Sequence, residues 1–278
     1  MSLRITILGC GSSGGVPRVG QGWGACDPSD PRNRRRRCSI LMERISGPRR
    51  TSVLVDTSPD LREQLLSQDV QRLDAVLMTH AHADHLHWID DVRPLVLQMR
   101  RRIPLFMDEP TAREVETKFG YVLASPPGSF YPPLFDAQPL SPGVPVSIDG
   151  PGGAIDVLPV LFRHGNIDAL GFRFGDALYS PDLSAVPRHS EPSLHNLDLW
   201  IIDALRYTPH ISHISVDQAL ELVGRFKPKR AVLTNLHTDL DYKSLSARLS
   251  PGVTAAFDGM TIFVRNPAYL EFRQRTKI

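Results

Sequence analysis

The stretch that decides the fold is "THAHADH", residues 79–85, at the end of an apolar run over residues 73–79 that is typical of a strand. It places three histidines and one aspartate within six residues, in the pattern H-x-H-x-D-H. Burial in a core does not account for that density, because each unpaired imidazole or carboxylate would cost free energy there. Imidazole and carboxylate groups are instead ligands of first-row metal ions. The sequence therefore predicts a metal centre on this segment.

The spacing within the motif predicts two adjacent metal ions. His80 and His82 are two residues apart, so their side chains point the same way on an extended strand end. Asp84 and His85 can curl back toward a second centre. One motif supplies too few ligands for two ions, so others must come from strand-end loops at one edge of a sheet, where α/β folds place active sites. The candidates, each of which follows a predicted strand, are His164, Asp182 and His237.

Strand and helix patterns along the chain alternate irregularly. The clearest helix covers residues 215–226, where Ser215 and Gln218 form a capping box and apolar residues recur on one face. Strands mixed with helices predict an α/β layered fold with a mixed sheet or two packed sheets. No repeat or linker divides residues 1–278, so we expect a single domain. The other predicted strands cover residues 52–56, 73–79, 154–162, 170–175, 197–203 and 230–236, and the other predicted helices cover 59–68 and 90–99.

Residues 124–153 differ from the rest of the chain because they contain eight prolines and five glycines. Phe130, Tyr131 and Phe135 lie between them. We expect one long ordered loop here. It would be either a lid or substrate wall, or an inert surface excursion.

The composition narrows the classes of function. The chain has 278 residues and a net charge of +2, which is too small to indicate nucleic acid or a membrane as the main partner. The sequence has no membrane-spanning stretch and no signal-peptide core, and its three cysteines form no C-x-x-C pair, so we expect a reduced, cytoplasmic compartment. The arginine cluster Arg34–Arg37 is either a solvated face or a contact for a phosphate-bearing ligand.

The glycine-rich stretch "ILGCGSSGGVP", residues 7–17, contains the pattern G-x-G-x-x-G. A dinucleotide site would need a helix to begin there, and Pro17 and the alternating glycines after it prevent one. We expect a tight backbone loop instead. It would close one wall of the metal site and lend N–H groups to a substrate phosphate.

These motifs carry a resemblance to a known family. "THAHADH", with His164, Asp182 and His237 in this order, resembles the metallo-β-lactamase superfamily. The resemblance spans nearly the whole chain and implies an αββα sandwich of two mixed sheets flanked by helices, with a dinuclear site at the open edge between the sheets. A branch of that superfamily contains the cyclic phosphodiesterase of the carbon-phosphorus lyase pathway, which opens 5-phosphoribosyl 1,2-cyclic phosphate. The stretches that resemble this branch are "GCGSSGGVP", "WGACDP", "NRRRRCS", "VDTSPDLR", "DDVRP", "IIDALR" and "DLDY".

The resemblance also implies roles for individual residues. One metal ion would be held by His80, His82 and His164, the other by Asp84, His85 and His237, and Asp182 would bridge them. Asp56 would orient a ligand imidazole, and His213 matches the position of the family's catalytic histidine. The best-known phosphodiesterase of the branch carries a structural zinc on clustered cysteines. Cys26 stands alone in that region of this chain, so we expect no such zinc.

The roles together predict a metal-dependent phosphodiesterase of small cyclic or nucleotide-like substrates. Two divalent ions, zinc or manganese, would lower the pKa of a bridging water, and the resulting hydroxide would attack phosphorus in line. Asp84 and His213 are the predicted catalytic residues, with His213 as the general acid toward the leaving oxygen. Arg206 would contact phosphate oxygens. We also expect a homo-oligomer.

Three other functions stay open at this point. A tRNA 3'-processing endonuclease would use the same seven ligands, but that branch usually carries a "GLPGL"-like turn where this chain has "LHWIDDVRP". It also carries a projecting arm, for which residues 124–153 are short. A carboxyl ester, thioester or lactone hydrolase would direct the same hydroxide at a carbonyl carbon. A non-catalytic RNA-binding module would use the arginine clusters, and the intact ligand set argues against it.

Overall fold

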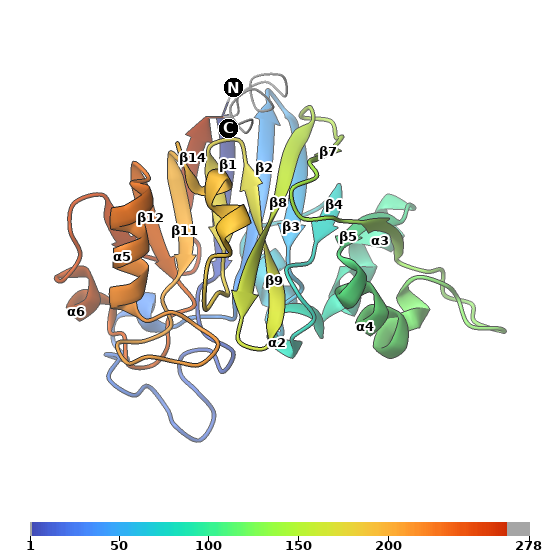
Figure 1. The fold of residues 1–278 in the computed structure, drawn as a ribbon. Helices are drawn as coiled ribbons and strands as arrows, with labels where there is room; N and C mark the ends of the chain where they lie inside the picture. The colour runs from blue at the N-terminus through green and yellow to red at the C-terminus, as the bar shows by residue number, and fades with distance from the viewer. Residues whose placement is uncertain (1, 266–278) are drawn as a thin grey trace.

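Two seven-stranded β-sheets form the centre of the computed structural model, which describes residues 2–265 (Figure 1). The strand order is β14-β1-β2-β3-β4-β5-β6 in the first sheet and β13-β12-β11-β10-β9-β8-β7 in the second. Each sheet is mixed, with three antiparallel and three parallel neighbouring pairs.

The strands of the first sheet are β1 (Ser2–Gly9), β2 (Ser39–Ser46), β3 (Arg49–Val55), β4 (Ala75–Leu77), β5 (Ile103–Met107), β6 (Phe135–Pro139) and β14 (Thr261–Arg265). The strands of the second sheet are β7 (Val146–Ile148), β8 (Ile155–His164), β9 (Ile167–Phe174), β10 (Ala177–Ser180), β11 (Leu199–Asp203), β12 (Arg230–Thr234) and β13 (Val253–Ala255). The α-helices are α1 (Leu61–Ser67), α2 (Ala83–Leu86), α3 (Arg93–Met99), α4 (Glu109–Phe119), α5 (Val216–Phe226) and α6 (Tyr242–Ser246). Short 3-10 turns are η1 (Pro31–Asn33), η2 (Ile89–Val92), η3 (Gly120–Val122) and η4 (Arg188–Leu194).

Three apolar clusters define the layers of the fold. Alternate residues of a strand point to opposite faces of its sheet. On β11, Ile201 belongs to the cluster between the two sheets, whereas its neighbours Trp200 and Ile202 pack outward against α5. On β4, Val76 packs outward with residues of α1 and α3. The fold is therefore the predicted αββα sandwich, with helices on both outer faces.

Helix α5 begins as the sequence predicts. The Ser215 hydroxyl accepts a hydrogen bond from the Gln218 N–H, and the Gln218 side chain accepts one from the Ser215 N–H. This capping box satisfies N–H groups that the first helical turn leaves without a partner. It fixes where the loop of residues 204–215 ends and the helix begins.

The prediction of one long loop over residues 124–153 is wrong, because two strands form within it. Residues of β6 pair with β5, and residues of β7 pair with β8. Both are edge strands, and a sheet edge tolerates proline because an N–H on the open side needs no partner in the sheet. Only the part before β6 projects from the body, where Phe130 is fully exposed (Figure 1).

The carboxyl ends of β3, β4, β8, β10, β11 and β12 meet at the edge that carries α2, at the bottom of Figure 1. The loop that follows β1 runs along the same edge and forms no α-helix before β2, which rules out a dinucleotide-binding turn. Among residues 2–265, no helix has the length and apolar character needed to cross a membrane.

Candidate metal centre

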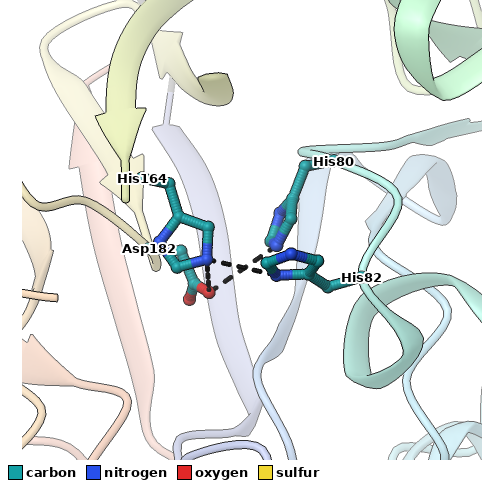
Figure 2. Close-up of side chains that lie close together, drawn as sticks. All are labelled: His80, His82, His164 and Asp182. Atoms are coloured by element: carbon teal, nitrogen blue, oxygen red, sulfur yellow. Dashed lines mark hydrogen bonds and ion pairs between the residues drawn. The ribbon is translucent and has the colours of Figure 1, made fainter. Parts of the chain in front are cut away.

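Four predicted ligands from three separate segments converge at this edge (Figure 2). His80 and His82 lie between β4 and α2, His164 ends β8, and Asp182 follows β10. One ligand atom from each of these four side chains lies within 4.8 Å of the others. The Oδ2 atom of Asp182 is 3.7 Å from His80 Nε2 and 3.4 Å from His164 Nε2. Three imidazoles and a carboxylate at this spacing suit a divalent metal ion.

His85 and Asp84 extend this cluster through Asp182. The Nε2 atom of His85 is 3.5 Å from Asp182 Oδ2 and 3.6 Å from Asp84 Oδ2. The short helix α2 begins after His82, and its first turn carries both Asp84 and His85. Asp182 Oδ2 therefore lies beside imidazole nitrogens from both predicted ligand groups, which is the place that a shared carboxylate would need.

The hydrogen bonds of the imidazoles leave the Nε2 atom of His80 for a metal ion, whereas His164 Nε2 lies 3.2 Å from His82 Nδ1. His164 Nδ1 donates to the Ser212 carbonyl at 2.7 Å, and His80 Nδ1 lies 3.0 Å from Thr79 Oγ1. His80 Nε2 is buried and has no hydrogen-bond partner. Burial also lowers the pKa of His80 well below its usual value, and lowers that of His164. Neutral imidazoles with a free, inward-facing nitrogen fit a metal ion.

Asp56 holds His85 in its orientation. Asp56 Oδ2 accepts a hydrogen bond from His85 Nδ1 at 2.7 Å, and Oδ1 accepts one from the Thr79 N–H at 2.8 Å. The backbone of Asp56 has φ of 66°, a left-handed conformation that is uncommon outside glycine and is found at functional sites. Burial lowers the pKa of His85, but the carboxylates of Asp182, Asp56 and Asp84 raise it by more, so it lies well above its usual value.

His213 lies beside the cluster and is paired with Asp203, a residue to which the sequence analysis gave no role. His213 Nδ1 donates to Asp203 Oδ2 at 2.9 Å, and the His213 and His164 ring centroids are 4.7 Å apart. Burial lowers the pKa of His213, but the hydrogen bond and charge of Asp203 raise it to about 9. Burial raises the pKa of Asp203 to about 7. The pair thus favours an imidazolium at His213.

Asn235 was also missed, and it joins this pair to the metal cluster. Its Nδ2 atom donates to Asp203 Oδ1 at 3.1 Å and to Asp182 Oδ1 at 3.2 Å. Asn235 has φ of 62°, the same left-handed conformation as Asp56. The sequence did contain a signal for Asp203. It is an aspartate at the end of a buried apolar strand, much as Asp56 comes directly after one. The amide of Asn235 carried no comparable signal.

His237 follows β12 as expected, but its ring nitrogens contact other groups. His237 Nδ1 is 2.9 Å from Asp239 Oδ1, and His237 Nε2 is 2.5 Å from Arg18 Nη1. Because a guanidinium has only donors, His237 Nε2 must accept this hydrogen bond. The structure therefore does not group His237 with the four clustered ligands, and its place in the ligand set stays a prediction.

Most of the predicted phosphate-contacting arginines are engaged within the protein. Arg206 donates to the carbonyls of Thr208 and Pro209, within the loop that leads to His213. In the arginine cluster, Arg35 is buried and donates to the carbonyls of His237 and Leu240. Arg36 pairs with Asp258 at 3.0 Å and Arg37 pairs with Asp60 at 3.2 Å. The cluster is therefore not simply a solvated face; Arg34 is exposed, all four arginines line a cavity of about 590 Å³, and a phosphate contact there stays a prediction.

The glycine loop packs closely against the chain, and its expected phosphate contacts stay a prediction. The N–H groups of Cys10, Gly11 and Ser12 already donate to protein acceptors at 3.1, 2.7 and 3.3 Å. A Cβ on Gly9 would lie 2.0 Å from the Arg37 carbonyl oxygen, so only glycine permits this approach.

A cavity of about 500 Å³ opens beside His80 and His82. Its other walls include Glu114 and Lys118 of α4 and Asp168 of β9. Glu114 and Lys118 form an ion pair at 2.7 Å. The cavity has the volume of a small-molecule site, and its mostly apolar wall carries a few charged side chains.

Comparisons with known proteins show the family and the fold. Residues 51–235 match the family model described as a beta-lactamase superfamily domain. A crystal structure of a new diphosphatase from the PhnP family is 32% identical to this chain, with a TM-score of 0.85, and the match covers 95% of this chain and 98% of that one. Zn²⁺-bound PqqB from Methylobacterium extorquens shares the fold at 16% identity and a TM-score of 0.70, over 93% of this chain and 99% of that one.

An octanoyltransferase of Porphyromonas gingivalis is 30% identical over 267 residues. The match covers 94% of this chain but 52% of that protein, so the chain spans about half the length of this curated relative. Family, PhnP-like relative and His/Asp cluster together support a metal-dependent hydrolase. The chain belongs to the beta-lactamase superfamily and, within it, resembles the PhnP family.

Proposed function

We propose that this protein is a metal-dependent phosphodiesterase that cleaves a small cyclic or nucleotide-like phosphodiester. The observation that carries the proposal is the His213–Asp203 pair beside the cluster of ligand-type side chains. Such a pair can deliver a proton to a leaving oxygen while the cluster binds the reacting phosphoryl group. The 32% identity to a PhnP-family diphosphatase over 95% of the chain supports phosphorus–oxygen bond cleavage.

Seven side chains would hold two divalent ions, zinc or manganese by the chemistry of the donor set. The proposed ligands are His80, His82 and His164 for one ion, Asp84, His85 and His237 for the other, and Asp182 shared between them. When bound, such ions lower the pKa of water toward neutrality and neutralise negative charge on a phosphoryl group. Binding of the second ion at His237 requires Arg18 to leave the Nε2 atom.

The protein's own groups place the proton donor. Asp203 accepts the Nδ1 proton of His213, which leaves the Nε2 proton for the leaving oxygen. The Ser212 carbonyl fixes the ring of His164 at the same time. One loop, residues 212–213, therefore orients a proposed ligand and the proposed general acid together. Asn235 donates hydrogen bonds to both Asp182 and Asp203, so it holds the proposed metal ligands and the His213–Asp203 pair at a fixed separation.

The cavity beside His80 and His82 would receive the alcohol part of the substrate. Its lining by Glu114, Lys118 and Asp168 suits a hydroxyl-bearing group such as a sugar. A homo-oligomeric state and a cytoplasmic location stay predictions, as does the phosphate contact of Arg206.

A hydrolysis screen tests the proposal. The protein is depleted of metal, reloaded with Zn²⁺ or Mn²⁺, and assayed on cyclic phosphates, nucleotide diesters, diphosphates, thioesters and lactones. We expect metal-dependent cleavage of a cyclic phosphate or small diester, and its loss in His82→Ala and His213→Ala. Diester cleavage that survives in His82→Ala, or a preference for every carbonyl substrate over every phosphate ester, contradicts the proposal.

A second candidate is hydrolysis of an acyl ester or thioester, and the octanoyltransferase of P. gingivalis favours it. The activity of that whole protein transfers to this chain only as a proposal, because the chain spans about half of it. An octanoyl thioester in the screen separates the two candidates. Precursor tRNA belongs in the same screen, because its cleavage at rates comparable to a small diester would favour a nuclease instead.

A further inference from the structure

Arg18 occupies the atom of His237 that a metal ion would need. Its Nη1 atom is 2.5 Å from His237 Nε2, while Nδ1 of the same ring contacts Asp239. A guanidinium can only donate, so the hydrogen bond uses the Nε2 lone pair. Metal coordination uses that same lone pair. Arg18 and a metal ion therefore exclude one another at His237.

Backbone hydrogen bonds hold the chain on both sides of Arg18, so we expect its side chain rather than its backbone to move away. Arg18 and Gly22 exchange two backbone hydrogen bonds of 2.8 Å, and Val16 and Arg35 exchange two of 2.9 Å just before them. The Arg18 side chain passes over Gly14, where a Cβ would lie 2.1 Å from Arg18 Nε. The backbone hydrogen bonds thus position Arg18 at the rim of the site, and the missing side chain of Gly14 leaves room for the guanidinium.

Electrostatics determine what Arg18 would contact once it leaves His237. A guanidinium tethered beside a divalent cation is repelled unless an anion lies between them. The planar fork of arginine matches the oxygens of a phosphate group and forms charge-assisted hydrogen bonds with them. Arg206 and Arg35 already donate to backbone carbonyls, whereas Arg18 gives up its contact with His237 when the ion binds.

We propose that Arg18 is the phosphate-binding, specificity-determining side chain of this site. Arg18 lies against His237 Nε2, at the rim of the cluster, and would turn to the substrate phosphate where an ion takes that nitrogen. This inference rests on the proposed function in that it assumes a phosphate-bearing substrate. It assigns recognition of the phosphate group to Arg18, in the loop between β1 and β2, rather than to Arg206.

The experiment measures equilibrium binding of inorganic phosphate to the metal-loaded protein by titration calorimetry. We expect Arg18→Gln to bind phosphate about 10- to 100-fold more weakly, and Arg18→Lys to fall between it and the unsubstituted protein, because lysine keeps the charge without the fork. Gly14→Ala should also weaken phosphate binding, because its added methyl group displaces Arg18. The matched control is Arg62→Gln, which removes a charge that is exposed and paired with Glu63, and it should leave phosphate binding unchanged.

Metal content, measured by mass spectrometry on each sample, separates anion binding from a role in holding the metal. We expect Arg18→Gln to keep two ions per chain and to bind the second at least as tightly. Phosphate affinity within twofold of the unsubstituted protein, loss of an ion in Arg18→Gln, or an unsubstituted protein that binds no phosphate each overturns the inference. Arg18-dependent phosphate binding without any diester hydrolysis would leave the inference standing while the proposed function fails.

Discussion

The two halves of the candidate site are built in different ways. One half is contiguous: His80, His82, Asp84 and His85 come from a single loop and the short helix α2. The other half is dispersed: three of its residues lie at or just after the ends of different strands of the second sheet, and His213 lies in the loop between β11 and α5. Its members are His164, Asp182, His213 and His237.

The two halves differ in which contacts hold their side chains in position. The contiguous half is fixed by local hydrogen bonds, chiefly those of Asp56 with His85 and Thr79. The dispersed half is fixed by the order of β8, β10, β11 and β12 and by bridging groups such as Asn235. We expect substitutions in the first half to act mainly on metal binding, and those around His213 to act mainly on proton transfer.

His82→Ala should have the largest effect, because it removes a ligand from the contiguous half. We expect hydrolysis to fall by about 10⁴-fold, because the phosphoryl group loses several kcal/mol of charge stabilisation. The loaded protein should retain less than two ions per chain by mass spectrometry. Full metal content with full activity would contradict the grouping of His82 with His80, His164 and Asp182.

His213→Ala tests the dispersed half and should come next. General acid catalysis is worth 10² to 10⁴ in rate, so we expect a loss of about 10³-fold in kcat. Metal content should remain unchanged, which distinguishes this variant from His82→Ala. A substrate whose leaving group needs no proton, such as a nitrophenyl diester, should be affected much less. An equal loss on both substrates would assign His213 a different role.

Asp56→Asn should act on the metal rather than on the chemical step. Asp56 accepts hydrogen bonds from both His85 Nδ1 and the Thr79 N–H, and an asparagine amide can accept only with its oxygen. We expect metal affinity to fall about 10- to 100-fold in a competition titration with a chelator. Excess metal should restore most of the activity. Asp136→Asn, at an exposed ion pair with Arg102, is the matched control.

Asp203→Asn should give the smallest change at neutral pH and a distinct pH profile. His213 must be protonated to act as an acid, so activity is lost as pH rises through its pKa, which Asp203 holds at about 9. Without the carboxylate that pKa falls, and the loss begins at lower pH. We expect kcat at pH 8 to drop roughly 10-fold, with little change near pH 6. If both proteins lost activity at the same high pH, Asp203 would not set the pKa of His213.

The sequence brings the residues of the contiguous half together because its information is local, while their roles as metal ligands stay predictions. The H-x-H-x-D-H motif follows a strand, and His164 and Asp182 follow strands of the second sheet as expected. Asp203 and Asn235 escaped notice because their roles depend on which strands are neighbours, which one sequence pattern does not specify. The same reason explains β6 and β7: an edge strand of low hydrophobicity forms only because β5 and β8 are beside it. The Arg18–His237 contact joins segments that no local pattern connects.

The buried Arg35 has a consequence for how the protein folds. Its hydrogen bond to the Leu240 carbonyl joins positions 205 residues apart in the chain, and the bond from Cys10 to Asp258 joins positions 248 apart. Contacts of such separation form late, because the entropy of closing a long loop is lost before they contribute. We therefore expect the loop that carries His237 to be among the last parts to be ordered. The contiguous half would assemble early, and the site would be complete only after Cys10 and Arg35 have met Asp258 and Leu240.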